Sequence, residues 1–341
     1  MRAVSPPNKT VNSEHESGPP TIELQGRAQE VPIVLPPWPA APAAKPKRLW
    51  LAILLFAITF FTCLAAGRQF AIAFANNQAA SVGEFFVSLK LLYKDPSALA
   101  SGFPFAISLM IILLSHELGH YFACKHHDIR ASYPYFIPAP TLIGTLGAFI
   151  LIRSPIRSRR ALFDVGASGP LAGFAVAIPI LIYGVIHSRV VPSIASEGTE
   201  IVFGVPLVMR LLAHRFFPDA NPLTLLLHPV GRAAWVGLFA TALNLLPVGQ
   251  LDGGHVLRSF QPRLHRWIGL LVPAILVALG YFWSVWWAWA GILLALRFLR
   301  IPPIQDQRPL DAPRVVLAMG TLLVMILCFM PVPLWQSATS H

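Results

Sequence analysis

The sequence predicts an all-α polytopic membrane protein with about 6–7 transmembrane helices and a membrane-dipping β-hairpin or re-entrant loop. Three observations predict this fold. Of the 341 residues, 55% are hydrophobic and 12% are charged, about half of the charged share of a soluble domain. The hydrophobic residues gather in runs of about 18 or more, long enough to cross a bilayer. One further apolar stretch, 131–153, is interrupted by prolines and glycines, which disfavour a regular helix.

The chain begins with a segment that has the composition of a disordered tail. Residues 1–47 hold ten of the 32 prolines and end in a short basic cluster. We expect a disordered, Pro-rich cytoplasmic tail there. The first long apolar run starts only near Leu49, so no N-terminal signal peptide is expected.

Seven segments are candidates for crossing the membrane, at about 49–66, 103–124, 162–187, 233–257, 266–282, 284–299 and 315–335. The fifth and sixth lie close enough to form a tight hairpin. Residues 201–212 are also apolar, but Pro206 and Arg210 interrupt them, so we expect an interfacial or loop element.

The positions of the basic residues predict the orientation. With the amino terminus in the cytoplasm, 19 of the 26 Lys and Arg residues fall on the cytoplasmic side and seven fall outside. Such a bias is typical of cytoplasmic loops. The net charge of +11 is therefore interpreted as membrane topology and not as nucleic-acid binding.

The segment 131–153 has two cytoplasmic ends by this count, so it should enter the membrane and return. It contains three prolines and then Gly144 and Gly147. Non-helical backbone at membrane depth needs protein or water around it, so we expect it to lie against helices or line a cavity.

Acidic residues are rare inside the predicted spans. Of the 15 Asp and Glu residues, only Glu117, Asp164 and Asp252 fall there. Asp164 follows Arg160 by four residues near a membrane edge, and a salt bridge between them would explain it. Glu117 and Asp252 lie deeper, where an ionisable group is costly and indicates function by default.

The motif His-Glu-Leu-Gly-His at 116–120 follows a long apolar run. On a helix, positions i and i+4 share one face, so His116 and His120 could hold one zinc ion. Glu117 could then act as a general base on a water at that metal. Two histidines that only pack between helices are the alternative, but they would strand three polar groups in an apolar run together with the Glu.

A catalytic zinc needs a third protein ligand, and Asp252 is the favoured candidate. It lies in an apolar stretch where Pro247 and several glycines break regular helix, as in segments that line a cavity. His255 is a rival that we favour as a neighbour of the ligands. His126 and His127 are rivals that we favour as interfacial residues, because they follow a basic residue.

Two depth estimates agree. At 1.5 Å per residue, His116 lies about 13 Å along a helix from Lys125, and Asp252 about 9 Å from Arg258. Both estimates place the site in the cytoplasmic half of the membrane.

Four stretches together resemble a known family. The HELGH motif and the later Asn-x-x-Pro-x-x-x-Leu-Asp-Gly motif at 244–253 are similar to the paired signatures of the site-2 protease family of intramembrane zinc metalloproteases. Residues 163–173 resemble that family's Gly-Pro core-helix motif, and 144–156 resemble the membrane-dipping stretch of its chloroplast and cyanobacterial-type branch. The resemblance covers about 100–260, and less clearly extends to 335.

The resemblance implies one Zn²⁺ per chain, held by His116, His120 and Asp252, with Glu117 as the base. It implies hydrolysis of a peptide bond in the transmembrane segment of a membrane-protein substrate, near the cytoplasmic face. Asn244 matches a family position associated with substrate or transition-state contact, and a polar helix-end cap is its alternative role.

The same resemblance predicts a metalloprotease domain at 48–336 with a catalytic core at about 100–260. We expect the compact form, without PDZ or CBS domains, as a multi-pass protein of a bacterial cytoplasmic membrane. Its expected partners are the lipid bilayer and the substrate's transmembrane segment.

A transmembrane helix must unwind locally before a protease can cut it, and its freed backbone groups then need partners. We expect the hairpin at 133–152 to offer a strand edge to the substrate, with Gly144, Thr145, Leu146 and Gly147 as substrate-binding residues. An equally weighted alternative is that this loop only plugs the site.

Three other functions use similar residues. A metal transporter or sensor could use the same ligands without proteolysis, but ionisable residues would then be spread across several helices. An inactive scaffold would not need Glu117. A CAAX-type prenyl protease also has HExxH, but the Leu-Asp-Gly motif fits site-2 proteases better.

Overall fold

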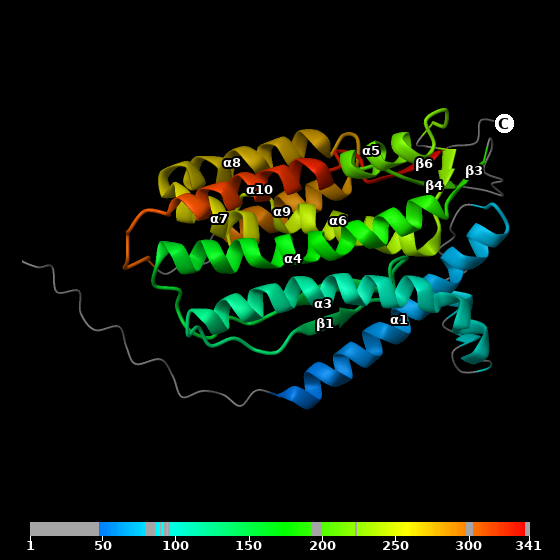
Figure 1. Cartoon of the computed structure of the whole chain (residues 1–341), viewed down its shortest axis with the longest axis horizontal. Coiled ribbons are helices and arrows are strands. Elements are labelled where there is room, and N and C mark those ends of the chain that lie inside the picture. Colours follow the sequence, from blue (N-terminus) through cyan, green and yellow to red (C-terminus); the bar gives the residue numbers. More distant parts are fainter. Residues whose placement is uncertain are drawn as a thin grey trace, which may run out of the picture. The chain divides into compact units, whose positions relative to one another are not determined.

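The computed structural model describes residues 48–337, with gaps at 79–85, 89, 92–93, 95, 192–199, 222–223 and 298–302. The predicted tail, 1–47, lies outside the described residues. Helices dominate the described part of the chain (Figure 1), as the sequence predicts. They are α1 (Leu49–Ala75), the short 3-10 helix η1 (Pro96–Gly102), α3 (Phe103–His126), α4 (Arg159–Ile186), α5 (Leu207–Phe216), α6 (Pro229–Asn244), α7 (Asp252–Phe260), α8 (Pro262–Leu279), α9 (Val285–Arg297) and α10 (Ala312–Cys328).

Four described helical stretches are long and apolar enough to cross a membrane: α1, Ser97–His126, α4 and α8. Helices α9 and α10 are apolar but shorter. The protein is therefore a mostly helical membrane protein, and the count of about 6–7 spans stays a prediction.

The predicted segment 233–257 consists of two helices and not one. Helix α6 ends at Asn244 and α7 begins at Asp252. Between them, Gly249 has a φ of +58°, a left-handed conformation that favours glycine. The break lets α7 start at Asp252.

Helices α3 and α4 lie side by side (Figure 1), and α6 and α7 also pack on α4. Their contact is close because small residues line it: a Cβ atom at Gly119 of α3 would lie 2.5 Å from the Ser168 carbonyl oxygen of α4. Buried side chains of α3 and α6, such as Leu109, Ile112 and Trp235, fill the adjoining core. Helix α4 is thus the central element against which the site is built.

In the part of the chain that the structure describes, six strands form three two-stranded antiparallel pairs. β1 (Tyr135–Pro138) pairs with β2 (Thr145–Phe149), and β3 (Arg189–Val190) pairs with β5 (Leu225–Leu226). β4 (Glu200–Phe203) pairs with β6 (Leu334–Ser337). The stretch predicted as an interfacial or loop element, 201–212, forms most of β4 and the start of α5.

The β1–β2 pair lies along α1, which crosses α3 at an angle (Figure 1). Thr62 of α1 donates a hydrogen bond to the Gly144 carbonyl oxygen at 2.6 Å, and Gln69 donates one to the Leu142 carbonyl oxygen at 2.8 Å. Phe56 packs edge-on against Phe136 with ring centroids 5.1 Å apart. These contacts hold the turn end of the hairpin, whereas its dipping into a membrane stays a prediction.

Asp164 of α4 has different partners from the one that the sequence suggested. Arg314 of α10 donates to both of its carboxylate oxygens, at 2.8 and 2.6 Å, and the His127 ring lies 2.7 Å away. The predicted salt bridge with Arg160 is therefore wrong, because α10 packs on α4 and brings Arg314 nearer. The cluster links α3, α4 and α10.

Candidate metal centre

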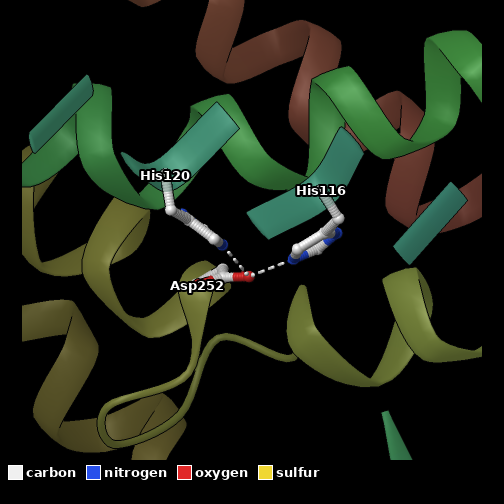
Figure 2. A group of neighbouring side chains, drawn as sticks. All are labelled: His116, His120 and Asp252. Carbon is white, nitrogen blue, oxygen red and sulfur yellow. Dashed lines mark hydrogen bonds and ion pairs between the residues drawn. The ribbon is translucent and has the colours of Figure 1, made fainter. Parts of the chain in front are cut away.

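Three side chains converge from α3 and α7 (Figure 2). The Nε2 atoms of His116 and His120 each lie 3.2 Å from Asp252 Oδ2. The three donor atoms lie within 4.8 Å of one another. Two imidazoles and one carboxylate are a common protein donor set for catalytic zinc, with a further position left for water or substrate.

The spacing of the two histidines follows from helix geometry. His116 and His120 lie one turn apart on α3, and both are buried. His120 Nδ1 lies 2.7 Å from the carbonyl oxygen of Val165 on α4, so this nitrogen is the donor. The Nε2 lone pair is then free to face Asp252, as a metal ligand requires.

Asp252 reaches the histidines because α7 starts at this residue. A carboxylate is favoured at a helix amino terminus, where backbone N–H groups are unpaired. The preceding loop folds tightly against the first turn of α7. A Cβ atom at Gly254 would lie 2.7 Å from two carbonyl oxygens of this loop, and one at Gly253 would overlap the carbonyl oxygen of Leu245. The two glycines after Asp252 therefore allow the close packing that sets its position.

Helix α4 forms the wall behind the histidines through three glycines. A Cβ atom at Gly169 would overlap His120 Nε2, and one at Gly173 would lie 3.1 Å from the His116 side chain. One at Gly166 would lie 2.7 Å from His255 Cβ. The spacing of three and four residues puts all three glycines on one face of α4. Because this face carries no side chains at Gly169 and Gly173, the imidazole rings of His120 and His116 can pack directly against the backbone of α4.

A cavity of about 200 Å³ lies in front of the donors. Glu117 lines it and is buried. Ala148, Phe149 and Ile152 line the same cavity. The segment around β2 thus forms one wall of the site.

Two further polar side chains line this cavity. Asn244 Nδ2, at the end of α6, lies 3.3 Å from His116 Nε2. His255 also lines the cavity, but it is not in the donor cluster found among the described residues. Its Nδ1 atom is buried without a hydrogen-bond partner in the described part of the chain.

The other rival histidines lie elsewhere. His127 Nε2 pairs with Asp164, and His126 is exposed at the end of α3. Neither belongs to the donor cluster found in the described residues.

The predicted substrate-binding residues 144–147 lie at the turn end of the hairpin. Gly144 and Gly147 have positive φ values of +85° and +103°, and Leu146 is 70% exposed. The cavity wall itself comes from the residues that follow, and sequence reasoning missed Ala148, Phe149, Ile150 and Ile152. Their signal was present, because all four lie in the predicted hairpin at 133–152.

Comparison with known proteins gives a decisive match. The family model described as peptidase family M50 matches residues 104–285, which include all three donors, Glu117 and Asn244. The chain belongs to peptidase family M50. This assignment confirms the resemblance to site-2 proteases.

Curated relatives of this M50 chain include plant proteins. It is 31% identical over 235 residues to a protein named probable zinc metalloprotease EGY1, chloroplastic, of Oryza sativa subsp. japonica, covering 63% of this chain and 38% of the relative. It is 28% identical over 312 residues to the protein of the same name from Arabidopsis thaliana, covering 84% and 54%. It is 29% identical over 244 residues to probable zinc metalloprotease EGY2, chloroplastic, of Arabidopsis thaliana, covering 69% and 43%.

The M50 chain thus matches about half or less of the length of these relatives. No solved structure matches it.

Proposed function

We propose that this protein is an intramembrane zinc endopeptidase that hydrolyses a peptide bond within or near the transmembrane segment of a membrane-protein substrate. The observation that carries the proposal is the convergence of His116, His120 and Asp252 on a cavity that Glu117 also lines. Membership of peptidase family M50 favours this function over a non-proteolytic metal transporter or sensor.

One Zn²⁺ fits the three donors, because both imidazoles offer Nε2 and the carboxylate faces them. A zinc ion there would supply Lewis acidity and would lower the pKa of a water enough for deprotonation near neutral pH. The protein's part is to fix the three donors. The Val165 carbonyl oxygen and the glycine face of α4 orient the histidines from behind.

Glu117 is the proposed general base. It follows His116 directly on α3, so its carboxylate reaches the same cavity beside the donors. Ile150 lines the same cavity as this carboxylate. Glu117 would take a proton from the attacking water and then deliver it to the leaving amine.

Asn244 is the proposed oxyanion donor. Its amide nitrogen is 3.3 Å from Nε2 of His116, a proposed zinc ligand, and this proximity supports the role. A preformed donor at this point can stabilise the negative charge that develops on the scissile carbonyl oxygen.

The hairpin is the proposed substrate platform. An unwound substrate segment could add to the extended segment 145–152, with Gly144, Thr145, Leu146 and Gly147 at its start. Backbone pairing of this kind would satisfy the polar groups that unwinding frees. The location of Ala148, Phe149, Ile150 and Ile152 at the cavity favours this role over a simple plug.

The proposed location is a bacterial cytoplasmic membrane, with the amino terminus in the cytoplasm and the site in the cytoplasmic half. The distribution of Lys and Arg supports this orientation. The metalloprotease domain would span 48–336, with its catalytic core at about 100–260.

The deciding experiment compares wild type, Glu117→Gln and Asp306→Asn on a purified transmembrane substrate, with bound zinc measured in each. Glu117→Gln should lower cleavage by about 100-fold or more and retain zinc, because it removes the base and leaves the donors. Asp306→Asn, a half-buried position whose carboxylate pairs with the exposed Arg308 and lies outside the donor cluster, should behave as wild type. Cleavage by Glu117→Gln at the wild-type rate would overturn the proposal.

A further inference from the structure

A second hollow lies on the far side of the hairpin from the metal centre. It has a volume of about 480 Å³ and is lined from α1 by Arg48, Leu51 and Leu55. From the hairpin it is lined by Tyr135, Phe149, Leu151 and Arg153. We name this hollow the outer groove.

The outer groove exists because α1 and the hairpin diverge. Thr62 and Gln69 bind the turn end of the hairpin to α1, and Phe56 still packs on Phe136 one to two turns earlier. Over the first turns of α1 no such contact closes the space between the described residues, and Leu51 and Leu55 face the groove instead. Figure 1 shows the amino-terminal end of α1 lying apart from α3.

The extended segment 148–153 divides the outer groove from the metal centre. Ala148, Ile150 and Ile152 line the cavity at the metal centre, whereas Leu151 and Arg153 line the outer groove. This division follows from the two-residue alternation of an extended chain. Phe149 lines both spaces, so the groove and the catalytic cavity meet at its ring.

The groove has a distinctive charge. Its centre is apolar, and Arg48 and Arg153 add two positive charges, with no acidic residue among the lining side chains that the structure describes. Between Asp128 and Asp164 the sequence has five arginines and no acid. An apolar segment that carries a carboxylate at its cytoplasmic end would complement this surface.

We propose that the outer groove is a docking site for the substrate before cleavage, and that it selects membrane segments with an Asp or Glu at their cytoplasmic flank. The inference rests on the proposed function and names a substrate class for it. The apolar part of the segment lies against Leu51, Leu55 and Leu151, and the carboxylate pairs with Arg48 and Arg153. From there the segment passes the ring of Phe149 to the metal centre.

The test uses model substrates that differ only in the residue at the cytoplasmic end of the transmembrane segment, which is Glu, Gln or Lys. In phosphatidylcholine vesicles, wild type should cleave the Glu substrate with a KM about two- to fivefold below that of the Gln substrate, with similar kcat, as expected for a part-exposed ion pair. Arg153→Gln and Arg48→Gln should each reduce this preference, and Arg153→Glu should reverse it toward the Lys substrate. The exposed Arg263→Gln is the control and should keep it.

Docking is also measured without cleavage. In the Glu117→Gln background, a photo-crosslinking residue at position 151 should capture the Glu substrate more strongly than the Lys substrate, and one at Trp267, 74% exposed on α8, should not discriminate.

Capture of the substrate by the crosslinking variant, without cleavage by wild type, would overturn the proposed function and leave the docking site. If wild type and every variant cleaved the Glu, Gln and Lys substrates equally well, the docking site would be overturned and the proposed function would stand. If the effect of the Arg153 substitutions on cleavage depended on phosphatidylglycerol in the vesicles and not on the flanking residue of the substrate, the groove would be assigned to an anionic lipid. That result would also overturn the inference.

Discussion

The two walls of the metal centre are built in opposite ways. On the α4 side, Gly169 and Gly173 lie so close to the two histidines that a single methyl group would collide with or crowd a ring. On the hairpin side, Phe149 and Ile152 of the cavity wall are 40% and 37% exposed, and Leu146 at the turn end is 70% exposed. The α4 wall has no room for an added methyl group, whereas the hairpin wall is accessible. We call them the close wall and the open wall.

This difference separates two requirements of the proposed reaction. The donor atoms must keep a fixed geometry, which close packing and a backbone hydrogen bond provide. The substrate backbone must reach the same atoms, which needs an accessible edge. Changes on the α4 wall should therefore affect metal binding, and changes on the hairpin wall should affect cleavage alone.

The largest expected effect tests the close wall. Gly169→Ala should lower zinc affinity by about 10- to 100-fold, since the added methyl group must displace the His120 ring. Gly173→Ala should have a smaller effect in the same direction, because its Cβ would lie 3.1 Å from the His116 side chain. Zinc affinity is measured by titration with a competing chelator.

The matched control for the glycine series is Gly320→Ala in α10, where a Cβ atom would meet nothing within 4 Å. Ala in place of Gly favours a helix by up to about 1 kcal/mol, so this variant should be as stable as wild type or more so. If Gly169→Ala bound zinc as tightly as Gly320→Ala, the close wall would not position the ligands.

The next effect tests the open wall. Leu146→Pro should lower cleavage of the transmembrane substrate by about tenfold while bound zinc stays unchanged, because proline removes a backbone donor and restricts the strand. Leu146→Ala keeps the backbone N–H and serves as the control. Unchanged turnover in Leu146→Pro would count against the strand-edge role and favour a plug.

A smaller effect concerns the support behind the close wall. Asp164→Asn should lower the free energy of unfolding by about 1–2 kcal/mol, because a part-buried carboxylate then loses its charge toward Arg314 and His127. Thermal unfolding in detergent measures this change. Asp306→Asn removes an ion pair whose Arg308 side chain is 75% exposed, and it should leave the unfolding temperature unchanged. Equal effects of both substitutions would contradict a role of the Asp164 cluster in tying α10 to α4.

The smallest effect concerns the attachment of the open wall. Thr62→Val removes the hydrogen bond to the Gly144 carbonyl oxygen and should cost about 0.5–1.5 kcal/mol locally. Amide exchange in residues 142–145 should become faster, while α3 and α4 keep their protection. Ser108→Ala removes a hydrogen bond within α3 and is the control. No change in hairpin exchange would show that Gln69 and Phe56 hold it alone.

Local pattern made much of the metal centre predictable. The histidine pair follows from helix periodicity, and the glycines and Pro247 marked the break that places Asp252 at the start of α7. The glycine face of α4 also had a signal, because positions 166, 169 and 173 share a helix face, but what they contact depends on how α3 packs.

Long-range partners were not predictable in this way. Local spacing offered Arg160 to Asp164, whereas packing of α10 supplied Arg314, 150 residues away. The pairing of β4 with β6 joins two four-residue strands that are more than 100 residues apart. Strands this short do not specify a partner through their sequence pattern.

The alternation of side chains in 148–153 also limits how this segment can change in evolution. Removing or adding one residue would turn Leu151 and Arg153 toward the metal centre and would expose Ala148, Ile150 and Ile152 to the groove. Removing or adding two residues would return each of these side chains to its original face. Insertions and deletions that distinguish homologues in this segment should therefore contain an even number of residues.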